Sequence, residues 1–515
     1  MNGAQALLRT LVAGGVDACF MNPGTSEMHF VAALDDVPEM RPVLGLFEGV
    51  VTGAADGYAR MAARPAAALL HLGPGLGNGI ANLHNARRAA SPVVAIVGDH
   101  ATYHKPLDAP LESDIDALAS NVSSWVRRSL KTSELPGDAA AAIAAAYGPP
   151  GQVATLIVPA DVSWSKGAAP LEPRLPRAAP PVREEAIRAA AAALRSEAPA
   201  AFLIGGDACS AENLARLGAL AAATGARLLC ETFPARLQRG AGRVAPERLA
   251  YLGEMASTQL DGLAHLVLVG AKSPVSFFAY PGKPSELVPA GCEVHSLCPP
   301  GEQVAAALEA LTALLPEGTA EPAAPERPAP PAGGEIGAVE LGLAVGALLP
   351  EEAVVVDEAN VSGLFIPGAT AGCPPHDWLT LTGGSIGMGL PLATGAAVAS
   401  PGRRVLALEA DGSAMYTAQA LWTMAREQLD VTTVILANRS YAILNMELQR
   451  VGAAAGGERA RRMLDLTGPE LDFVHLAEAM GVPASRATTA DELVDQLQAA
   501  LFTPGPSLVE AVITR

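Results

Sequence analysis

Short apolar runs alternate with longer stretches rich in alanine and leucine along most of the chain. The clearest runs are VVAIVG (93–98), TLIVPA (155–160), AFLIGG (201–206), HLVLVG (265–270), RVLALEA (404–410) and VTTVILAN (431–438). Each is short enough for a strand and ends in small or polar residues. Strands that are apolar on both faces and alternate with helices are typical of parallel sheets covered on both sides. The pattern therefore predicts an α/β protein with doubly wound parallel sheets.

Two stretches interrupt this pattern, because proline and small residues crowd there without hydrophobic periodicity. They are SKGAAPLEPRLPRAAPPVRE (165–184) and PEGTAEPAAPERPAPPAGGE (316–335), and such composition is typical of linkers. A chain of 515 residues is also too long for a single core. We therefore expect three doubly wound domains, at residues 1–165, 185–315 and 335–515.

Composition narrows the partners and the cellular location. A net charge of −18 disfavours nucleic acid and anionic membranes as partners. The six cysteines show no CxxC pair and no histidine cluster with zinc spacing, so we expect reduced thiols. The first residues lack a signal-peptide pattern, and no long uninterrupted apolar stretch is found. A cytoplasmic location is the expectation.

The segment 406–441 predicts a metal site. Its first strand ends in Asp411-Gly412-Ser413, a helix is expected from about Thr417 to Gln428, and the next strand ends at Asn438. The ends of adjacent parallel strands meet at one edge of a sheet, so Asp411, Asn438 and the backbone carbonyl of Ser440 could offer Mg²⁺ three oxygen ligands. The alternative is that Asp-Gly-Ser is only a strand-to-helix turn with a cap.

A lone carboxylate stands in the apolar run VLGLFEGVV (43–51). Glu48 would be costly to bury there unless it is paired or protonated. An exposed position on an amphipathic edge strand is the alternative, and the flanking apolar side chains disfavour it. His71 ends another apolar run and precedes a glycine-rich loop; it could be a structural, hydrogen-bonded residue or an active-site residue.

With these motifs the chain resembles the thiamine diphosphate-dependent decarboxylase and carboligase family, which includes acetolactate synthase and benzoylformate decarboxylase. That family carries Gly-Asp-Gly and, further on, Asn-Asn; here Ala410 and Ala437 replace the first glycine and the first asparagine. LTGGSIGMGLP (381–391) resembles the segment that grips the aminopyrimidine ring, and FMNPGTSEMHF (20–30) the Asn-Pro-Gly loop near the substrate. The domains would then be pyrimidine-binding, central and diphosphate-binding.

The resemblance implies roles for individual residues. Glu48 would activate the cofactor through a pyrimidine nitrogen, His71 would move a proton, and Thr25 would orient the substrate. Ile386 would be the wedge between the two cofactor rings, although a core plug is the alternative. The residues expected at the cofactor are Glu48, Asn360, Gly384, Ile386, Met388, Gly412, Ser413 and Tyr441, and those expected at the metal are Asp411, Asn438 and Ser440.

The resemblance implies decarboxylation or carboligation of a 2-oxo acid with thiamine diphosphate and Mg²⁺. Acetolactate-synthase-like carboligation is the first interpretation. The alternative is a benzoylformate-type decarboxylase that releases an aldehyde, as His71 indicates, with phenylalanine in place of a second histidine around SFFAYPG (276–282). A non-catalytic member is a further alternative.

The middle piece lacks an adenine-dinucleotide fingerprint, so bound flavin is not expected. The resemblance also implies a homodimer as the smallest active unit and a homotetramer as the assembled form. Ile443, Leu444 and Glu447 are expected to line the substrate pocket together with Thr25 and His71.

Overall fold

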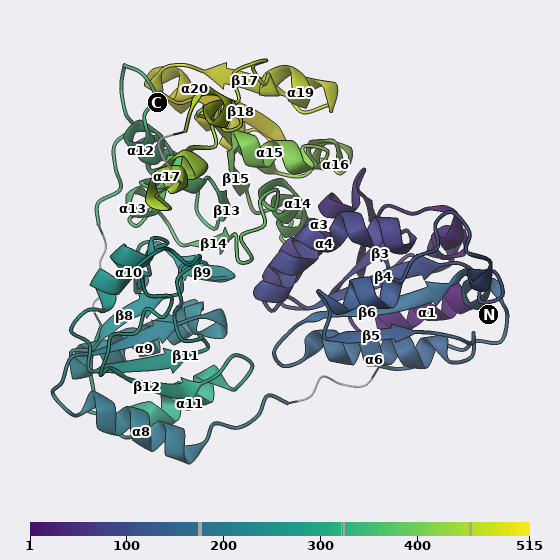
Figure 1. Cartoon of the computed structure of the whole chain (residues 1–515), viewed down its shortest axis with the longest axis horizontal. Helices are drawn as coiled ribbons and strands as arrows, with labels where there is room; N and C mark the ends of the chain where they lie inside the picture. Colours follow the sequence, from purple (N-terminus) through teal and green to yellow (C-terminus); the bar gives the residue numbers. More distant parts are fainter. Residues whose placement is uncertain (174–177, 321, 323–324, 453–455, 515) are drawn as a thin grey trace.

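The chain folds into three lobes, each built around its own sheet (Figure 1). The computed structural model describes residues 1–173, 178–320, 322, 325–452 and 456–514. Both predicted linkers contain residues outside this description, namely 174–177 in the first and 321, 323 and 324 in the second. The N-terminal lobe lies to the right in Figure 1, the C-terminal lobe at the top and the central lobe at the lower left.

The N-terminal lobe holds a six-stranded, all-parallel sheet of order β2-β1-β3-β4-β6-β5. The chain winds one way from β1 to β2 and the other way from β3 onward, so the switch point lies between β1 and β3. Its elements are α1 (Gly3–Ala13), β1 (Ala18–Met21), α2 (Met28–Ala33), β2 (Arg41–Leu44), α3 (Glu48–Ala62), β3 (Ala66–Leu70), α4 (Leu72–Arg88), β4 (Val93–Asp99), α5 (Ile115–Ser120), β5 (Trp125–Arg128), α6 (Leu135–Tyr147), β6 (Val153–Pro159) and α7 (Ala160–Trp164).

The central lobe holds a five-stranded parallel sheet of order β10-β8-β7-β11-β12, in which β12 is an edge strand. Helices cover both of its faces, and separate buried clusters fill the two sides. Its elements are α8 (Glu184–Leu194), β7 (Ala200–Ile204), α9 (Ala211–Thr224), β8 (Arg227–Cys230), β10 (Glu247–Arg248), α10 (Gly253–Leu260), β11 (His265–Val269), β12 (Glu293–Cys298) and α11 (Val304–Thr312).

The C-terminal lobe holds a seven-stranded sheet of order β17-β18-β16-β15-β13-β14-β9. Its switch point lies between β13 and β15. Its elements are α12 (Ala338–Leu348), β13 (Val354–Glu358), α13 (Ile366–Ala369), β14 (His376–Thr380), α14 (Gly389–Ala399), β15 (Val405–Ala410), α15 (Asp411–Thr417), α16 (Ala420–Arg426), β16 (Val431–Ala437), α17 (Ala442–Arg450), α18 (Glu458–Arg462), α19 (Phe473–Ala479), β17 (Ala484–Ala487), α20 (Ala490–Phe502) and β18 (Ser507–Val512).

One strand does not fit the expected scheme of purely parallel sheets. β9 (Arg236–Arg239) belongs to the central part of the chain, yet it pairs antiparallel with β14 at the edge of the C-terminal sheet. A strand that arrives from another domain needs no crossover helix and can therefore pair in the antiparallel direction. The central and C-terminal lobes thus share a sheet.

The N-terminal and C-terminal lobes meet where α3 crosses α14 (Figure 1). The crossing is very close because both helices carry glycine there. A Cβ at Gly57 would lie 2.1 Å from the carbonyl oxygen of Leu392, and one at Gly395 would lie 1.8 Å from that of Ala54. Any side chain at either position would push the two lobes apart, so these glycines set their relative position.

The predicted fold class is confirmed, since the structure has three α/β lobes with mostly parallel sheets. All six apolar runs contain a strand. The helix expected from about Thr417 to Gln428 is present as α16, over Ala420–Arg426, but a separate helical segment, α15, precedes it and begins at Asp411. The run around Glu48 is also not one continuous strand, since β2 ends at Leu44 and α3 begins at Glu48.

Within the described residues, no helix is both long enough and apolar enough to cross a membrane. All six cysteines are free thiols, and five of them are buried.

Candidate active and cofactor site

The predicted metal ligands lie together at the carboxyl edge of the C-terminal sheet. Asp411 is the first residue of α15 and is 3% exposed. Its Oδ2 accepts the backbone N–H of Arg439 at 2.5 Å, and Oδ1 of Asn438 accepts the N–H of Ser440 at 2.9 Å. The donor set at this edge is therefore a carboxylate, an amide oxygen and backbone carbonyls. Hard oxygen donors of this kind fit Mg²⁺.

The two departures from the family motif do not disturb this geometry. Ala410 has φ −70° and ψ 141°, an extended conformation that any residue adopts, so no glycine is required there. Ala437 is the last residue of β16 and is buried in the core. The backbone therefore presents Asp411 and Asn438 at the sheet edge without the glycine and asparagine of the motif.

Side chains from three segments gather beside this cluster. Nδ2 of Asn360 donates to Oγ of Ser413 at 3.3 Å, and Asn360 itself has φ +51°, in the left-handed region. The ring of Tyr441 lies against Gly412, where a Cβ would come within 2.5 Å of Cε1. Four residues predicted at the cofactor are thus neighbours. They surround the helix start at which a diphosphate would meet backbone N–H groups.

The loop predicted to grip the pyrimidine ring is held from the N-terminal lobe of the same chain. Nδ2 of Asn85 on α4 donates to the carbonyl of Ser385 at 2.8 Å, and Nδ2 of Asn82 donates to that of Gly387 at 3.3 Å. Ile386 is partly buried and packs against the core shared by the two lobes. Met388 is fully buried in the same core.

Two buried glutamates lie directly beneath this loop. Glu358 ends β13, and its Oε1 accepts the N–H of Gly387 at 2.7 Å; the N–H of Gly389 donates to the other oxygen. Glu409 on β15 faces Glu358, and its carboxyl group is fully buried. Burial raises the pKa of both carboxyl groups, and the mutual repulsion raises that of Glu409 further.

This pair makes stability depend on pH. When folding raises the pKa of a carboxyl group, the folded chain keeps the proton at pH values where the unfolded chain has lost it. The free energy of unfolding therefore falls as the pH rises from about 4.5, the ordinary pKa, through the pKa in the folded chain. In Glu409→Gln the neutral amide replaces the protonated acid. We expect this variant to gain stability relative to wild type as the pH rises from 5 to 8, by up to about 1.4 kcal/mol per pH unit. Its melting temperature should rise relative to that of wild type over the same range.

Thermal melts of both proteins at several pH values measure this difference. Glu185→Gln, at an exposed glutamate in the first turn of α8, is the control and should keep a constant offset from wild type. A constant offset for Glu409→Gln as well would contradict a pKa of Glu409 that is raised on folding.

The N-terminal lobe holds a glutamate–histidine pair at its own switch point. His71 follows β3, and its Nδ1 lies 2.8 Å from Oε2 of Glu27, which sits in the short helix after β1 (Thr25–Glu27). Glu27 is 3% exposed, and burial raises its pKa while the charge of His71 lowers it. Because Nδ1 of His71 is hydrogen-bonded to Glu27, Nε2 is the ring nitrogen available to contact a substrate.

Two glycines shape the space around this pair. A Cβ at Gly24 would lie 2.2 Å from Nδ1 of His71, and a Cβ at Gly98 would lie 1.6 Å from Oε1 of Glu27. The N–H of Gly24 also donates to Oε2 of Glu27 at 2.7 Å. Thr25, the next residue, is exposed at the rim. The loop thus fixes the pair and leaves Thr25 accessible.

Glu48 lies at the start of α3 and is 8% exposed. Its Oε2 accepts a hydrogen bond from Nδ2 of Asn78 at 3.0 Å, and its Oε1 lies 3.1 Å from where a Cβ of Gly75 would be. The side chain is therefore held by α4 in a shielded position, as the sequence predicted.

Aromatic side chains of the central lobe face the pyrimidine-gripping loop. Phe277 contacts Phe233, Tyr251 and Phe278, and its ring comes within 2.6 Å of where a Cβ of Gly384 would be. The segment 276–282, where phenylalanine was noted in place of a second histidine, thus reaches the site. Ile443, Leu444 and Glu447 lie on α17, which carries no fully buried residue.

The candidate site consists of two halves. The hydrogen bonds described for Glu48 and His71 run to Asn78 and Glu27 in the N-terminal lobe. Those described for Asp411 run to residues of the C-terminal lobe. The predicted acid–base residues and the predicted metal ligands therefore lie on different lobes, and we call these two parts the acid–base half and the metal half.

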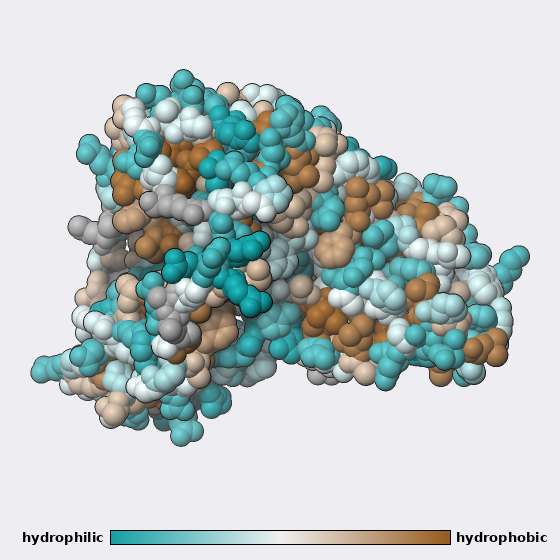
Figure 2. Space-filling view, turned by 45° about the horizontal axis from the view of Figure 1, so that its top comes forward, coloured by the Kyte–Doolittle hydropathy of each residue, from teal (hydrophilic) through white to brown (hydrophobic). Residues whose placement is uncertain are grey.

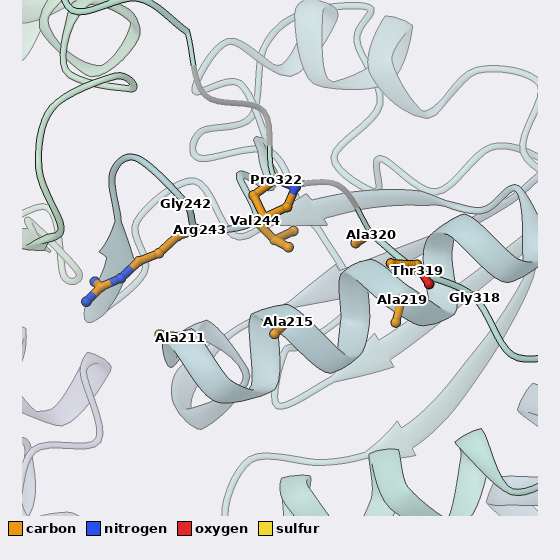
Figure 3. Close-up of a pocket in the computed structure, with 10 residues that line it drawn as sticks. All are labelled: Ala211, Ala215, Ala219, Gly242, Arg243, Val244, Gly318, Thr319, Ala320 and Pro322. Carbon is orange, nitrogen blue, oxygen red and sulfur yellow. The ribbon is translucent and has the colours of Figure 1, made fainter.

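A separate hollow of about 350 Å³ lies in the central lobe. Figure 3 shows that alanines of α9 line one side and Val244 and Pro322 the other, while the guanidinium group of Arg243 points away. Small apolar side chains predominate among its lining residues, and it belongs to neither half of the candidate site. The expectation of no bound flavin stays a prediction.

Sequence reasoning missed Glu27, Glu358 and Glu409. A signal existed for Glu409, since it stands in an apolar run just as Glu48 does, but the run was interpreted only as a strand. The sequence gives little indication that Glu27 is buried. Its burial depends on contacts between the ends of β1, β3 and β4, which are far apart in the sequence and meet only in the folded chain.

Comparison with known proteins shows the family to which the chain belongs. Residues 1–120 match the family model of the thiamine pyrophosphate enzyme, N-terminal TPP binding domain, and residues 369–511 match that of the C-terminal TPP binding domain. These two models and the relatives below define the class of protein, an enzyme dependent on thiamine pyrophosphate. The chain belongs to the thiamine pyrophosphate enzyme family.

Named relatives extend over the whole length. The chain is 61% identical to the putative acetolactate synthase large subunit IlvX of Mycobacterium tuberculosis, over 100% of this chain and 99% of the relative. It is 32% identical to benzoylformate decarboxylase of Pseudomonas aeruginosa, over 96% of each. A solved thiamine diphosphate-dependent 4-hydroxybenzoylformate decarboxylase of Rhodococcus jostii superposes with a TM-score of 0.88 at 25% identity, covering 100% of this chain and 99% of that one.

Proposed function

We propose that this enzyme decarboxylates a 2-oxo acid with thiamine diphosphate and Mg²⁺ and releases the product as an aldehyde. The observation that carries the proposal is the Glu27–His71 pair at the switch point of the N-terminal sheet. When bound, thiamine diphosphate supplies the electron sink that decarboxylation needs. The residues of this chain hold the cofactor and move protons.

Asp411, Asn438 and the backbone near Ser440 would hold Mg²⁺, because they lie at one sheet edge, where Asp411 accepts the N–H of Arg439, the neighbour of Asn438. Asn360, Gly412, Ser413 and Tyr441 would surround the diphosphate, and Gly384 and Ile386 would meet the ring system. Glu48 would hold a proton at the pyrimidine, since its carboxyl group is shielded by α4.

His71 would deliver the proton that completes the product, from Nε2. Glu27 keeps the ring oriented through Nδ1 and is therefore a positioning residue. Thr25, exposed beside the pair, would orient the substrate carboxylate. The aromatic wall of Phe277 and Phe278 supports a substrate with an apolar or aromatic side chain.

Carboligation of two 2-oxo acids is the second candidate. It is favoured by the 61% identical relative that bears the name of a putative acetolactate synthase large subunit. In that route the last bond is made to a second carbonyl group, and a proton from His71 is not needed to form it. The two routes therefore differ in their dependence on this histidine.

A homodimer as the active form is supported by the placement of Glu48 and Asp411 on different lobes of one chain. Apolar side chains are exposed next to both, including Val361, Leu364 and Phe365 beyond Asn360. Figure 2 shows such apolar groups at several places on one face of the molecule. We propose that a second copy covers part of this surface and brings its Glu48 to the metal half.

His71→Ala tests the proposal. We expect aldehyde release to slow by roughly 10² to 10⁴, the usual contribution of a positioned acid or base, with little change in cofactor affinity. Both aldehyde and hydroxyketone are measured from pyruvate and from benzoylformate. His29→Ala, at an exposed histidine of α2, is the control.

Loss of aldehyde with hydroxyketone retained would favour carboligation as a second activity. Unchanged rates for both products would mean that His71 is structural and would overturn the proposal. Glu27→Gln should shift the pH–rate profile in the same reaction, because it changes the group that faces Nδ1.

A further inference from the structure

Three potential metal ligands converge in the central lobe, far from either half of the candidate site. Nδ1 of His265 on β11 lies 3.2 Å from Nε2 of His295 on β12. An oxygen of Glu293 lies 3.9 Å from the first nitrogen and 3.8 Å from the second. The donor atoms of all three residues lie within 4.8 Å of one another.

The strands place these ligands by their register. Glu293 is the direct partner of His265 in the parallel pair β11–β12, and His295 lies two residues further along the same strand. Residues two apart share one face of a sheet, so the three side chains point to the same side. In the sequence His265 is distant from the other two, which is why no zinc-like spacing is visible there.

We propose that His265, Glu293 and His295 bind one Zn²⁺ ion. Ligand nitrogens about 2.0 to 2.1 Å from a tetrahedral zinc lie about 3.3 to 3.4 Å from each other, close to the 3.2 Å found here. The carboxylate needs to move by only a few tenths of an ångström, and its side chain is 70% exposed and free to do so. Two imidazoles and one carboxylate form a zinc ligand set that leaves a fourth position for water.

The two imidazoles lie largely inside the fold, while the carboxylate reaches the surface. The side chains of His265 and His295 are only 17% and 9% exposed, against 70% for that of Glu293. The ligands lie at the amino ends of the strands, opposite the edge at which such sheets bind cofactors. A metal here would join the edge strand β12 to β11, so its role is to stabilise the central lobe.

Zinc titration of the full-length protein tests this site. Competition with a chromogenic chelator is measured with thiamine diphosphate and Mg²⁺ present in excess, so that the C-terminal edge is saturated. We expect one Zn²⁺ bound per chain and a rise in melting temperature on its addition. His265→Ala and His295→Ala should each weaken binding by more than about tenfold.

His475→Ala is the matched control. His475 also pairs with a carboxylate, Asp472, at 2.7 Å, and its side chain is 80% exposed. No second histidine joins this pair in the described part of the chain. Glu293→Gln, at an exposed side chain, serves if a histidine variant fails to fold. Co²⁺ bound to wild type should show the strong visible absorption of tetrahedral coordination. No saturable zinc binding, or equal binding in wild type and the ligand variants, would overturn the proposal.

Discussion

Glu48→Gln is expected to lower turnover by roughly 10² to 10⁴ while leaving the fold and cofactor binding intact. The amide fits the same space and can still hydrogen bond with Asn78, but it cannot hold or release the proton that cofactor activation requires. Exchange of the proton at the reactive carbon of bound thiamine diphosphate, followed by NMR in deuterated buffer, measures this step directly.

Loss of a negative charge at a helix start could itself change stability. Glu185→Gln removes the same charge from the first turn of α8 and therefore controls for that effect. It should retain full activity and wild-type exchange. If Glu48→Gln exchanged its proton at the wild-type rate, the assignment of Glu48 would fail.

Asp411→Ala is expected to leave a folded protein that no longer retains thiamine diphosphate at micromolar concentrations. The diphosphate would then meet a protein of net charge −18 without its neutralising cation. Wild type should show a higher melting temperature when thiamine diphosphate and Mg²⁺ are added together, and chelation of the metal should abolish this rise.

Asp491→Ala is the control, because Asp491 also lies in the first turn of a helix of the same lobe but at an exposed position. It should keep the full thermal shift. Metal-dependent cofactor binding that persists in Asp411→Ala would show that another residue is the ligand. Absence of the shift in wild type would instead favour a member of the family that has lost its cofactor.

The α/β class and the strands of the six clearest apolar runs could be predicted from the sequence, because buried parallel strands are apolar on both faces and therefore visible as short runs. The segments around Asp411, Asn438 and His71 could be found because each follows such a run directly. The start of α15 could not, since Asp-Gly-Ser is compatible with either a turn or a first helical turn, and packing decides between them.

Contacts between separate segments were beyond reach for a different reason. The pairs Glu27–His71 and Glu358–Glu409 each join residues that follow or end different strands, so their proximity depends on strand order. No periodicity in the chain encodes that order. Strand β9 is the same case, because its sequence carries no sign of which sheet it joins.

The placement of β9 limits how this protein can be divided. Arg236 on β9 donates to Asp377 at 2.7 Å, and the guanidinium of Arg239 lies 4.8 Å from the ring centre of Trp378. A C-terminal fragment that begins at the second linker would lack β9, so β14 would become an edge strand with unpaired backbone groups and Trp378 would be uncovered. Such an edge promotes association with other chains. A chimera of two relatives would therefore fold well only if β9 and β14 came from the same parent.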